Sequence, residues 1–268
     1  MQQSDMAEES AQRQIILHGF WTRYSSWTAR VELVLEHFRI PYTARYYSIF
    51  NPADRPRDER FRGRLYPMLQ PDAQDADFLV DESLAICEYL AETFPDRELW
   101  PKDVKLRALA RGAAAQMHDG FSELRNSYDT NFIARYTGKV PISDAARVEI
   151  SKMIGIWDRA RSHTKQRLQE LGQDDAGFLF GNFSIADAFF WPVLWRFRSY
   201  QLPLDGISQD ALRWMATMWN DPVMKEQAVW YFKQAEDPAT CTPKYDDIFK
   251  GNPDVHFGQF DKNWEFSP

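Results

Sequence analysis

Cysteine is scarce in this chain. Only Cys87 and Cys241 occur among 268 residues, so the sequence holds no disulfide framework. No CxxC pair and no Cys/His cluster has the spacing of a metal site. We therefore expect no bound metal, and a protein that works in a reducing compartment.

Long apolar runs and an excess of positive charge are also missing. No stretch approaches the roughly 20 apolar residues of a membrane span, and residues 1–14 lack the apolar segment of a secretion signal. The net charge of −7 argues against nucleic acid or an anionic membrane as a partner. Arginines do gather between residues 55 and 64, but acidic residues alternate with them, which is typical of a solvated segment. We expect a cytoplasmic protein.

The first hundred residues combine strand and helix patterns. An apolar run ended by Gly19-Phe20 indicates a buried strand, and a helix with apolar residues at i, i+3, i+4 and i+7 from Val31 follows it. An aromatic-rich strand after Pro41 completes a β-α-β unit, which predicts a parallel strand pair. A ββα unit comes next. The expected strands are 15–20, 42–49, 65–69 and 77–80, and the last helix runs from Glu82-Ser83 to about Thr93.

Helical patterns replace strand patterns after residue 103. The expected helices are 104–136, 143–171, 184–200, 208–219 and 222–234. The change falls at Trp100-Pro101-Lys102-Asp103, and no internal repeat is visible. We therefore expect a small α/β domain over residues 14–100, an all-helical domain over residues 104–235 and an extension over residues 236–268.

The dipeptide Glu82-Ser83 places a carboxylate and a hydroxyl at the start of an apolar helix. The first N–H groups of a helix are unpaired and carry partial positive charge. A ligand carboxylate can therefore dock on the amide and hydroxyl of Ser83, while Glu82 pairs with an amine of the same ligand. A group that carries both is an amino acid, such as the γ-glutamyl end of glutathione. The alternative is an ordinary helix cap.

Four segments together resemble the cytosolic glutathione transferases. They are 24–30 (YSSWTAR), 66–69 (YPML), 81–86 (DESLAI) and 181–187 (GNFSIAD), in the order of that family. The resemblance implies a thioredoxin-like N-terminal domain, which binds glutathione, and an all-helical C-terminal domain, which binds the second substrate. The Ser25-Ser26-Trp27 start is similar to the serine-type classes, particularly the zeta group of maleylacetoacetate isomerases. Two features depart from the family: the turn at 70–76 is long, and the extension is additional.

The resemblance assigns the thiol chemistry to a serine. The family carries its thiol-contacting residue five positions before Arg30, which gives the catalytic role to Ser25, with Ser26 as the neighbouring alternative. For both residues the alternative is that they only cap the helix. A cysteine at this position would imply mixed-disulfide chemistry, so its absence argues against a thiol reductase or peroxidase.

The remaining glutathione contacts are also assigned by resemblance. Pro67 matches the family's cis-proline, which turns the backbone of Tyr66 towards the cysteinyl part of glutathione. Glu82 and Ser83 take the γ-glutamyl end. A basic group usually meets the glycyl carboxylate, for which Arg64 and Arg62 are the candidates.

Four residues are expected to line the substrate pocket: Trp27, His118, Phe121 and Arg125. Ordinary helix packing is the alternative for each of them. Asp187, which follows Ser184 by three residues in a capping-box pattern, is interpreted as a folding residue, not a catalytic acid. His18 and Cys87 are interpreted as core residues.

The predicted function is a glutathione transferase that activates the glutathione thiolate for attack on an electrophilic small molecule. A glutathione-dependent cis–trans isomerase of a conjugated metabolite is the first alternative, and a non-catalytic binding protein of the same fold is the second. The resemblance also implies a homodimer. The extension is expected to pack over the active-site mouth or across a dimer, because disordered tails are poor in aromatic residues. Its aromatic residues are Tyr245, Phe249, Phe257, Phe260, Trp264 and Phe266.

Overall fold

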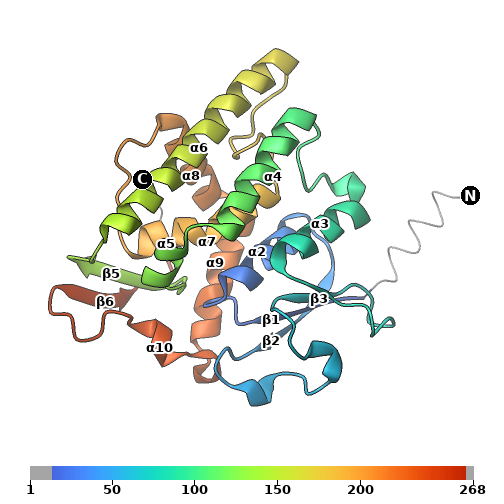
Figure 1. Ribbon diagram of the computed structural model, residues 1–268, viewed down its shortest axis with the longest axis vertical. Coiled ribbons are helices and arrows are strands. Elements are labelled where there is room, and N and C mark those ends of the chain that lie inside the picture. The colour runs from blue at the N-terminus through green and yellow to red at the C-terminus, as the bar shows by residue number, and fades with distance from the viewer. Residues whose placement is uncertain (1–13, 264–268) are drawn as a thin grey trace, which may run out of the picture.

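The computed structural model describes residues 14–263, and a four-stranded sheet forms the base of its N-terminal part (Figure 1). Strand β1 (Ile15–Phe20) pairs in parallel with β2 (Tyr42–Tyr47) and antiparallel with β3 (Met68–Gln70), which pairs with β4 (Val80–Asp81). The strand order is β2-β1-β3-β4. The parallel pair is the one that the β-α-β pattern predicts. The last two strands start three residues later than expected, at Met68 and Val80.

Helix α2 (Ser26–His37) connects β1 to β2 and is buried over its first ten residues, from Ser26 to Leu35, apart from Trp27. It lies between the sheet and the helical part of the chain, where it packs against α7 (Ile185–Ser199). Short 3₁₀ turns, η1 (Pro52–Asp54) and η2 (Glu59–Phe61), occupy the arginine-rich segment. Helix α3 (Ser83–Thr93) and η3 (Pro95–Arg97) complete this thioredoxin-like domain.

The rest of the chain is mainly helical, as predicted. Its helices are α4 (Val104–Asp119), α5 (Ser122–Ser127), α6 (Asp144–Leu171), α7, α8 (Gln209–Asn220) and α9 (Pro222–Ala235). The capping box at the start of α7 is confirmed, because Ser184 N–H donates to Asp187 Oδ2 at 3.0 Å and both reciprocal contacts are present. Indoles fill the core of this domain: Trp157, Trp191, Trp195, Trp214 and Trp219 are all at most 2% exposed. His18 and Cys87 are buried in the first domain, as expected.

The expected long helix over 104–136 is wrong. Helix α4 ends at Asp119 because Gly120 leaves the helical conformation and Phe121 adopts φ 61°, after which only the short α5 forms. A strand follows, β5 (Ala134–Gly138), in which Ala134 and Tyr136 are buried and Arg135 is exposed. This period of two is the strand signal that the helical interpretation missed.

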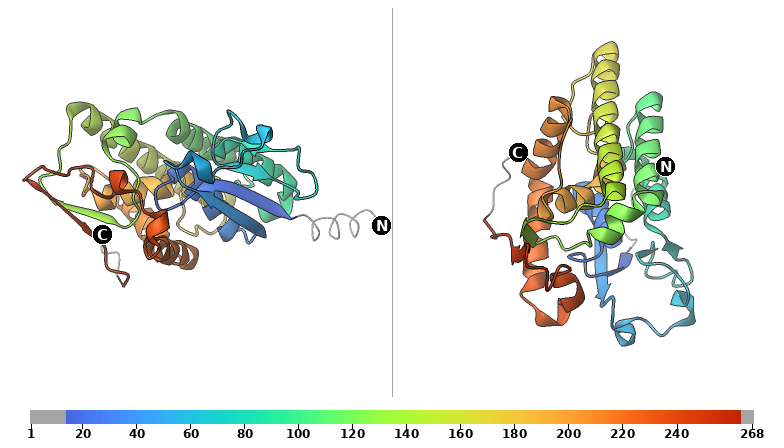
Figure 2. Two further views of the ribbon diagram at one scale, coloured as in Figure 1. Left: turned by 90° about the horizontal axis from the view of Figure 1, so that it is seen from below. Right: turned by 60° about the vertical axis from the view of Figure 1, so that its left-hand side comes forward.

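Strand β5 pairs with the extension. The extension contains η4 (Pro238–Thr240), α10 (Pro243–Asp246) and β6 (Val255–Gln259), and β6 runs antiparallel to β5 at the left of Figure 1. Figure 1 places α10 at the lower edge of the molecule, and in the right-hand view of Figure 2 the red C-terminal part of the chain reaches down to the level of the blue strands. The described part of the extension therefore packs on its own chain. The expected packing of Trp264 and Phe266 concerns residues outside the described range.

Residues 14–263 contain neither a membrane-spanning helix nor a cluster of metal ligands. None of the helices described is both long and apolar enough to cross a membrane. No group of three or more His, Cys, Asp or Glu side chains in the same range is arranged to hold a metal ion.

Candidate functional site

The start of α2 presents two serine hydroxyls. Ser25 is the N-cap of the helix, and its Oγ accepts from the Thr28 N–H at 3.3 Å and lies 2.9 Å from Thr28 Oγ1. Thr28 Oγ1 also accepts the N–H of Phe20 at 3.1 Å. Thr28 can therefore donate its own proton to Ser25 Oγ, which leaves the Ser25 proton available to a ligand. Ser26 follows as the first helical residue.

A cleft of about 460 Å³ opens at this helix start. Four of the sequence-predicted residues line it: Ser25, Ser26, Trp27 and Arg125. The remaining lining comes from both domains and from the extension: Phe20, Tyr24, Ile49, Ser122, Asn126, Asp129, Thr130, Arg196 and Tyr245. The cleft therefore combines aromatic walls with hydroxyl, amide and charged groups.

Glu82 stands at the start of α3 in a strained conformation, φ 79° and ψ 128°. Its carboxylate turns back onto its own helix and accepts the N–H of Leu84 at 3.0 Å and of Ala85 at 3.2 Å. Ser83 is the first helical residue, and its hydroxyl donates to Glu82 Oε1 at 3.1 Å. Glu82, not Ser83, is thus the side chain that caps this helix, through the amides of Leu84 and Ala85.

His118 and Phe121 do not line the cleft, contrary to the sequence-based expectation. His118 projects from α4 towards α3, where its Nδ1 lies 3.5 Å from Glu82 Oε1 and its ring meets Trp27 edge-on at 5.3 Å. Phe121 is 3% exposed and points towards α6, with Lys152 Nζ 5.3 Å from its ring centre. The break after α4 turns Phe121 into the core, which sequence spacing on one continuous helix could not predict.

The Tyr66–Pro67 peptide bond is cis. The Tyr66 ring lies 4.7 Å from the ring of Phe20, which lines the cleft, so this turn is adjacent to the helix start that carries Ser25. Arg64 lies near the start of α3, 3.4 Å from Asp81.

Two other arginines of this segment differ in position. Arg62 is 78% exposed and pairs with Glu59, and neither residue lines the cleft. Arg55, which was not among the residues expected to bind glutathione, is half-buried, with its guanidinium 5.0 Å from the Phe20 ring. Arg55 is therefore closer to the cleft wall than Arg62.

The region behind the cleft is positively charged. Arg30 is fully buried between the rings of Trp27 and Phe189, at 4.5 and 4.9 Å, and none of its three side-chain nitrogens has a hydrogen-bond partner among residues 14–263. Burial, with the charges of Arg196 and Arg125, lowers the pKa of Arg30 to about 9. Arg196 is also buried and is held by carbonyl and hydroxyl oxygens, including the Tyr128 carbonyl at 2.9 Å. This field favours a negative charge in the cleft.

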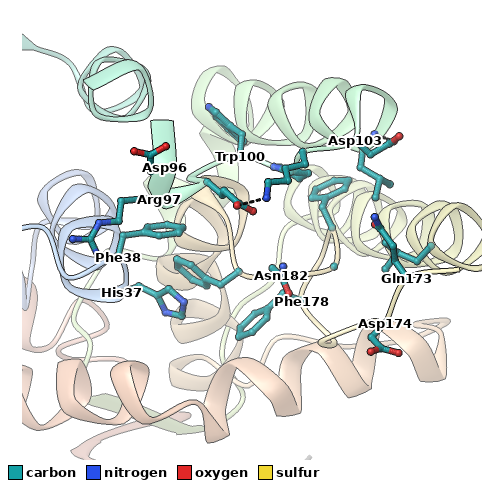
Figure 3. Close-up of a pocket in the computed structure, with 18 residues that line it drawn as sticks. His37, Phe38, Asp96, Arg97, Trp100, Asp103, Gln173, Asp174, Phe178 and Asn182 are labelled. Carbon is teal, nitrogen blue, oxygen red and sulfur yellow. Dashed lines mark hydrogen bonds and ion pairs between the residues drawn. The ribbon is translucent and has the colours of Figure 1, made fainter. Parts of the chain in front are cut away.

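A larger cavity of about 750 Å³ lies elsewhere, beside the C-terminal end of α2 (Figure 3). It is lined by His37, Phe38, Trp100 and Asn182 among others, and by none of the sequence-predicted site residues. Three of the charged side chains on its wall are in ion pairs, Lys102 with Glu98 and Asp103 with Arg167. The cleft at the start of α2 is therefore the candidate site.

Two family models match the chain in the order that the fold predicts. The N-terminal domain model of glutathione S-transferases matches residues 24–93, which include Ser25, cis-Pro67 and Glu82. The C-terminal domain model of the same family matches residues 141–217. The chain belongs to the glutathione S-transferase family.

Among curated members of the family, several similar proteins are maleylacetoacetate isomerases. The isomerase of Dictyostelium discoideum is 29% identical over 124 residues, which are 46% of this chain and 55% of the relative. A probable maleylacetoacetate isomerase of Drosophila melanogaster is 33% identical over 118 residues, 44% of this chain and 51% of the relative. A glutathione S-transferase of Triticum aestivum is 35% identical over 94 residues, 35% and 40% of the two chains. The chain spans about half the length of the curated relatives it matches.

Solved structures share the glutathione S-transferase fold along most of the chain. A glutathione transferase homologue from Burkholderia gl BGR1, with bound glutathione, has a TM-score of 0.55 at 22% identity and covers 84% of this chain and 100% of its own. Ure2p in complex with glutathione, from yeast, has a TM-score of 0.55 at 17% identity and covers 85% and 98%. At these identities the likeness establishes the fold.

Proposed function

We propose that this glutathione S-transferase family member binds glutathione between the starts of α2 and α3 and activates its thiol at Ser25. The observation that carries the proposal is the placement of Ser25 and Ser26 at the N-terminal end of a 12-residue helix, facing a cleft. Tyr66 of the cis peptide would meet the cysteinyl backbone, and Glu82 and Ser83 would take the γ-glutamyl end. Arg64 is the proposed partner of the glycyl carboxylate, with Arg55 as a second candidate on the cleft side.

The energy that thiol activation requires matches what this site offers. A free thiol with a pKa near 8.5 is only about 3% ionised at pH 7. Lowering that pKa by about two units takes about 2.7 kcal/mol of preferential binding of the thiolate. One hydroxyl hydrogen bond, the positive end of α2 and the field of Arg30, Arg125 and Arg196 supply effects of this size.

Two reactions can follow from the activated thiolate. It can remain bonded to the electrophilic carbon, which is conjugation, or it can add to a conjugated bond, allow rotation and leave again, which is cis–trans isomerisation. The similarity to maleylacetoacetate isomerases supports the second reaction, and Arg125 and Arg196 on the cleft wall suit a substrate with a negative charge. Incubation of candidate enones with catalytic glutathione distinguishes them, because an isomerase turns over without consuming glutathione.

The assembly and the location of the protein are inferred from its family. We infer a cytoplasmic homodimer, as is usual in this family, and sedimentation at micromolar concentration tests the dimer. A non-catalytic protein of the same fold would lack turnover on all electrophiles. The presence of Ser25 at the start of α2 and of Glu82-Ser83 at the start of α3 argues against that alternative, because a purely structural role needs no thiol-activating group.

The test of the proposal is a pair of serine variants. Ser25→Ala should lower kcat/KM by about 10²-fold or more and raise the apparent pKa of bound thiol towards its free value, since it removes the thiolate's hydrogen bond. Ser26→Ala is the matched control one residue away and should change kcat/KM by less than about threefold. The reverse pattern would move the role to Ser26. If wild-type protein neither binds glutathione in calorimetry nor turns over, the proposed function is wrong.

A further inference from the structure

The extension reaches residues 21–25, here called the serine loop, which end at the N-cap Ser25 of α2. Residues Arg23 and Tyr24 directly precede Ser25 in the chain, and both hydrogen-bond to Asp246, more than 220 residues away in the sequence. Asp246 lies at the end of α10, which Figure 1 places low in the molecule, near the ends of α9 and β2. The extension therefore contacts the segment whose conformation places Ser25.

Arg23 is the main anchor of this contact. Its side chain is 2% exposed, and its Nη2 donates to Asp246 Oδ1 at 2.9 Å. Its other nitrogens meet weaker partners, Asn131 Oδ1 at 3.4 Å and Cys241 Sγ at 3.5 Å. Asp246 thus supplies the carboxylate that the buried guanidinium needs, since an unpaired buried charge is strongly unfavourable.

The Tyr24 hydroxyl forms two hydrogen bonds with the extension. Its O–H donates to Asp246 Oδ1 at 2.7 Å, and its oxygen accepts the N–H of Thr242 at 3.2 Å. This hydroxyl is therefore fully used by the extension and does not compete with Ser25 for the glutathione thiol. The same contacts fix the side chain that immediately precedes Ser25.

The extension also forms part of the cleft wall. Tyr245, the neighbour of Asp246, lines the cleft, and its ring lies 6.1 Å from Tyr24 and 5.3 Å from Phe50. The Tyr245 carbonyl accepts Asn131 Nδ2 at 3.1 Å. Extension, serine loop and the segment after β2 thus meet at one edge of the cleft.

We propose that Asp246 is a positioning residue for Ser25: by binding Arg23 and Tyr24 it holds the serine loop in the geometry that activates glutathione. This inference rests on the proposed function. Asp246 touches neither glutathione nor substrate; it acts through the two residues before Ser25. The extension is then a working part of the active site and not only a strap across the surface.

The test is Asp246→Asn in the full-length protein, with Asp246→Glu as the conservative variant. Asparagine keeps the shape but leaves Arg23 without a counter-charge. We expect kcat/KM with glutathione to fall about tenfold and the acid limb of its pH profile to move up by about half a unit, a threefold change in the ionisation constant of bound thiol. Asp246→Glu should restore much of both. Asp247→Asn is the matched control, because the Asp247 carboxylate binds only the N–H of Phe249 in the described chain.

The sign of the pH shift separates positioning from a purely electrostatic role. Removal of a negative charge near the thiolate would by itself lower the thiol pKa, whereas displacement of Ser25 raises it. A downward shift in Asp246→Asn, or a profile and kcat/KM equal to those of Asp247→Asn, would overturn the inference.

A second readout needs no activity. In unliganded protein, the backbone amides from Arg23 to Ser26 should exchange hydrogen about tenfold faster in Asp246→Asn than in wild type or Asp247→Asn. Equal exchange in all three proteins refutes the positioning role even if wild type turns over. Absence of glutathione binding by wild type would overturn the proposed function; faster exchange in the variant would then still show that Asp246 holds the segment before Ser25 in place.

Discussion

Replacement of Glu82 should separate the stability of the protein from its affinity for glutathione. Glu82 combines two opposing features: its carboxylate caps α3, and its backbone stands at φ 79°. Glycine adopts positive φ without strain, whereas alanine does not. We therefore expect Glu82→Gly to be more stable than Glu82→Ala, although glycine removes Cβ as well and adds flexibility to the unfolded chain.

The magnitudes follow from the contacts of Glu82. Loss of the cap, with its bonds to the amides of Leu84 and Ala85, costs about 0.5–2 kcal/mol in both variants. In the glycine variant, relief of backbone strain stabilises the folded state by about 1–3 kcal/mol. The freer unfolded chain offsets about 0.4–1 kcal/mol of this gain. The free energy of unfolding of Glu82→Gly should therefore lie within about 1 kcal/mol of the wild-type value, and that of Glu82→Ala about 0.5–2 kcal/mol below it.

Affinity should respond differently. Both variants lack the carboxylate proposed to pair with the γ-glutamyl amine, so both should bind glutathione about 1–3 kcal/mol more weakly, the scale of a hydrogen bond between charged groups. Glu82→Gln keeps the shape and the strain and loses only the charge, and it should show the same loss.

The assays are urea unfolding for stability and calorimetric titration with glutathione for affinity. Glu82→Gly with wild-type affinity would refute the assignment of Glu82 to the γ-glutamyl amine. Equal stability of the glycine and alanine variants would show that the positive φ carries no strain.

Two further predictions concern buried carboxylates. Burial raises the pKa of Glu32 from 4.5 to about 7, so the folded protein holds this proton more tightly than the unfolded chain. The associated stabilisation, up to about 3 kcal/mol, is present below pH 4.5 and is lost as the pH rises through 7. In Glu32→Gln the free energy of unfolding, measured with urea, should therefore vary less with pH across this window. An unchanged pH dependence would contradict the raised pKa of Glu32. Asp187→Ala leaves four buried donors without their acceptor, including Leu179 N–H and Trp214 Nε1–H, and should lower stability by at least about 3 kcal/mol. A loss below about 1 kcal/mol would contradict the folding role of Asp187.

The sequence could predict what depends on local pattern. The β-α-β unit, the helical second part and the capping box at Ser184 are set by periodicity and by neighbouring residues, and each is found in the structure. The placement of Ser25 at a helix start was readable for the same reason, because caps act over three or four residues. The prediction was wrong at Gly120, because helix-like spacing of apolar residues continues past the residue at which α4 ends.

Residues brought together only by tertiary structure could not be found in this way. Arg196 and Tyr245 reach the cleft from α7 and from the extension, and no spacing rule connects either with Ser25. The positive φ of Glu82 gives no signal in the sequence, because the residue type there is ordinary. His118 was expected on the cleft because of its place on one long helix; in the structure its Nδ1 lies 3.5 Å from Glu82 Oε1, a contact that no spacing rule indicates.

The arginines around the start of α2 show what the extension adds to this site. Four arginines lie near the start of α2: Arg23, Arg30, Arg125 and Arg196. Of these four, only Arg23 forms an ion pair with a carboxylate of residues 14–263, that of Asp246. The extension thus neutralises the one arginine that holds the serine loop and leaves the charges of the other three to act on the cleft. If charge alone governed activity, a protein without Asp246 would be the better thiol activator. Because the thiolate also needs a hydroxyl at a fixed place, we expect the opposite, and the direction of the pH shift decides between the two.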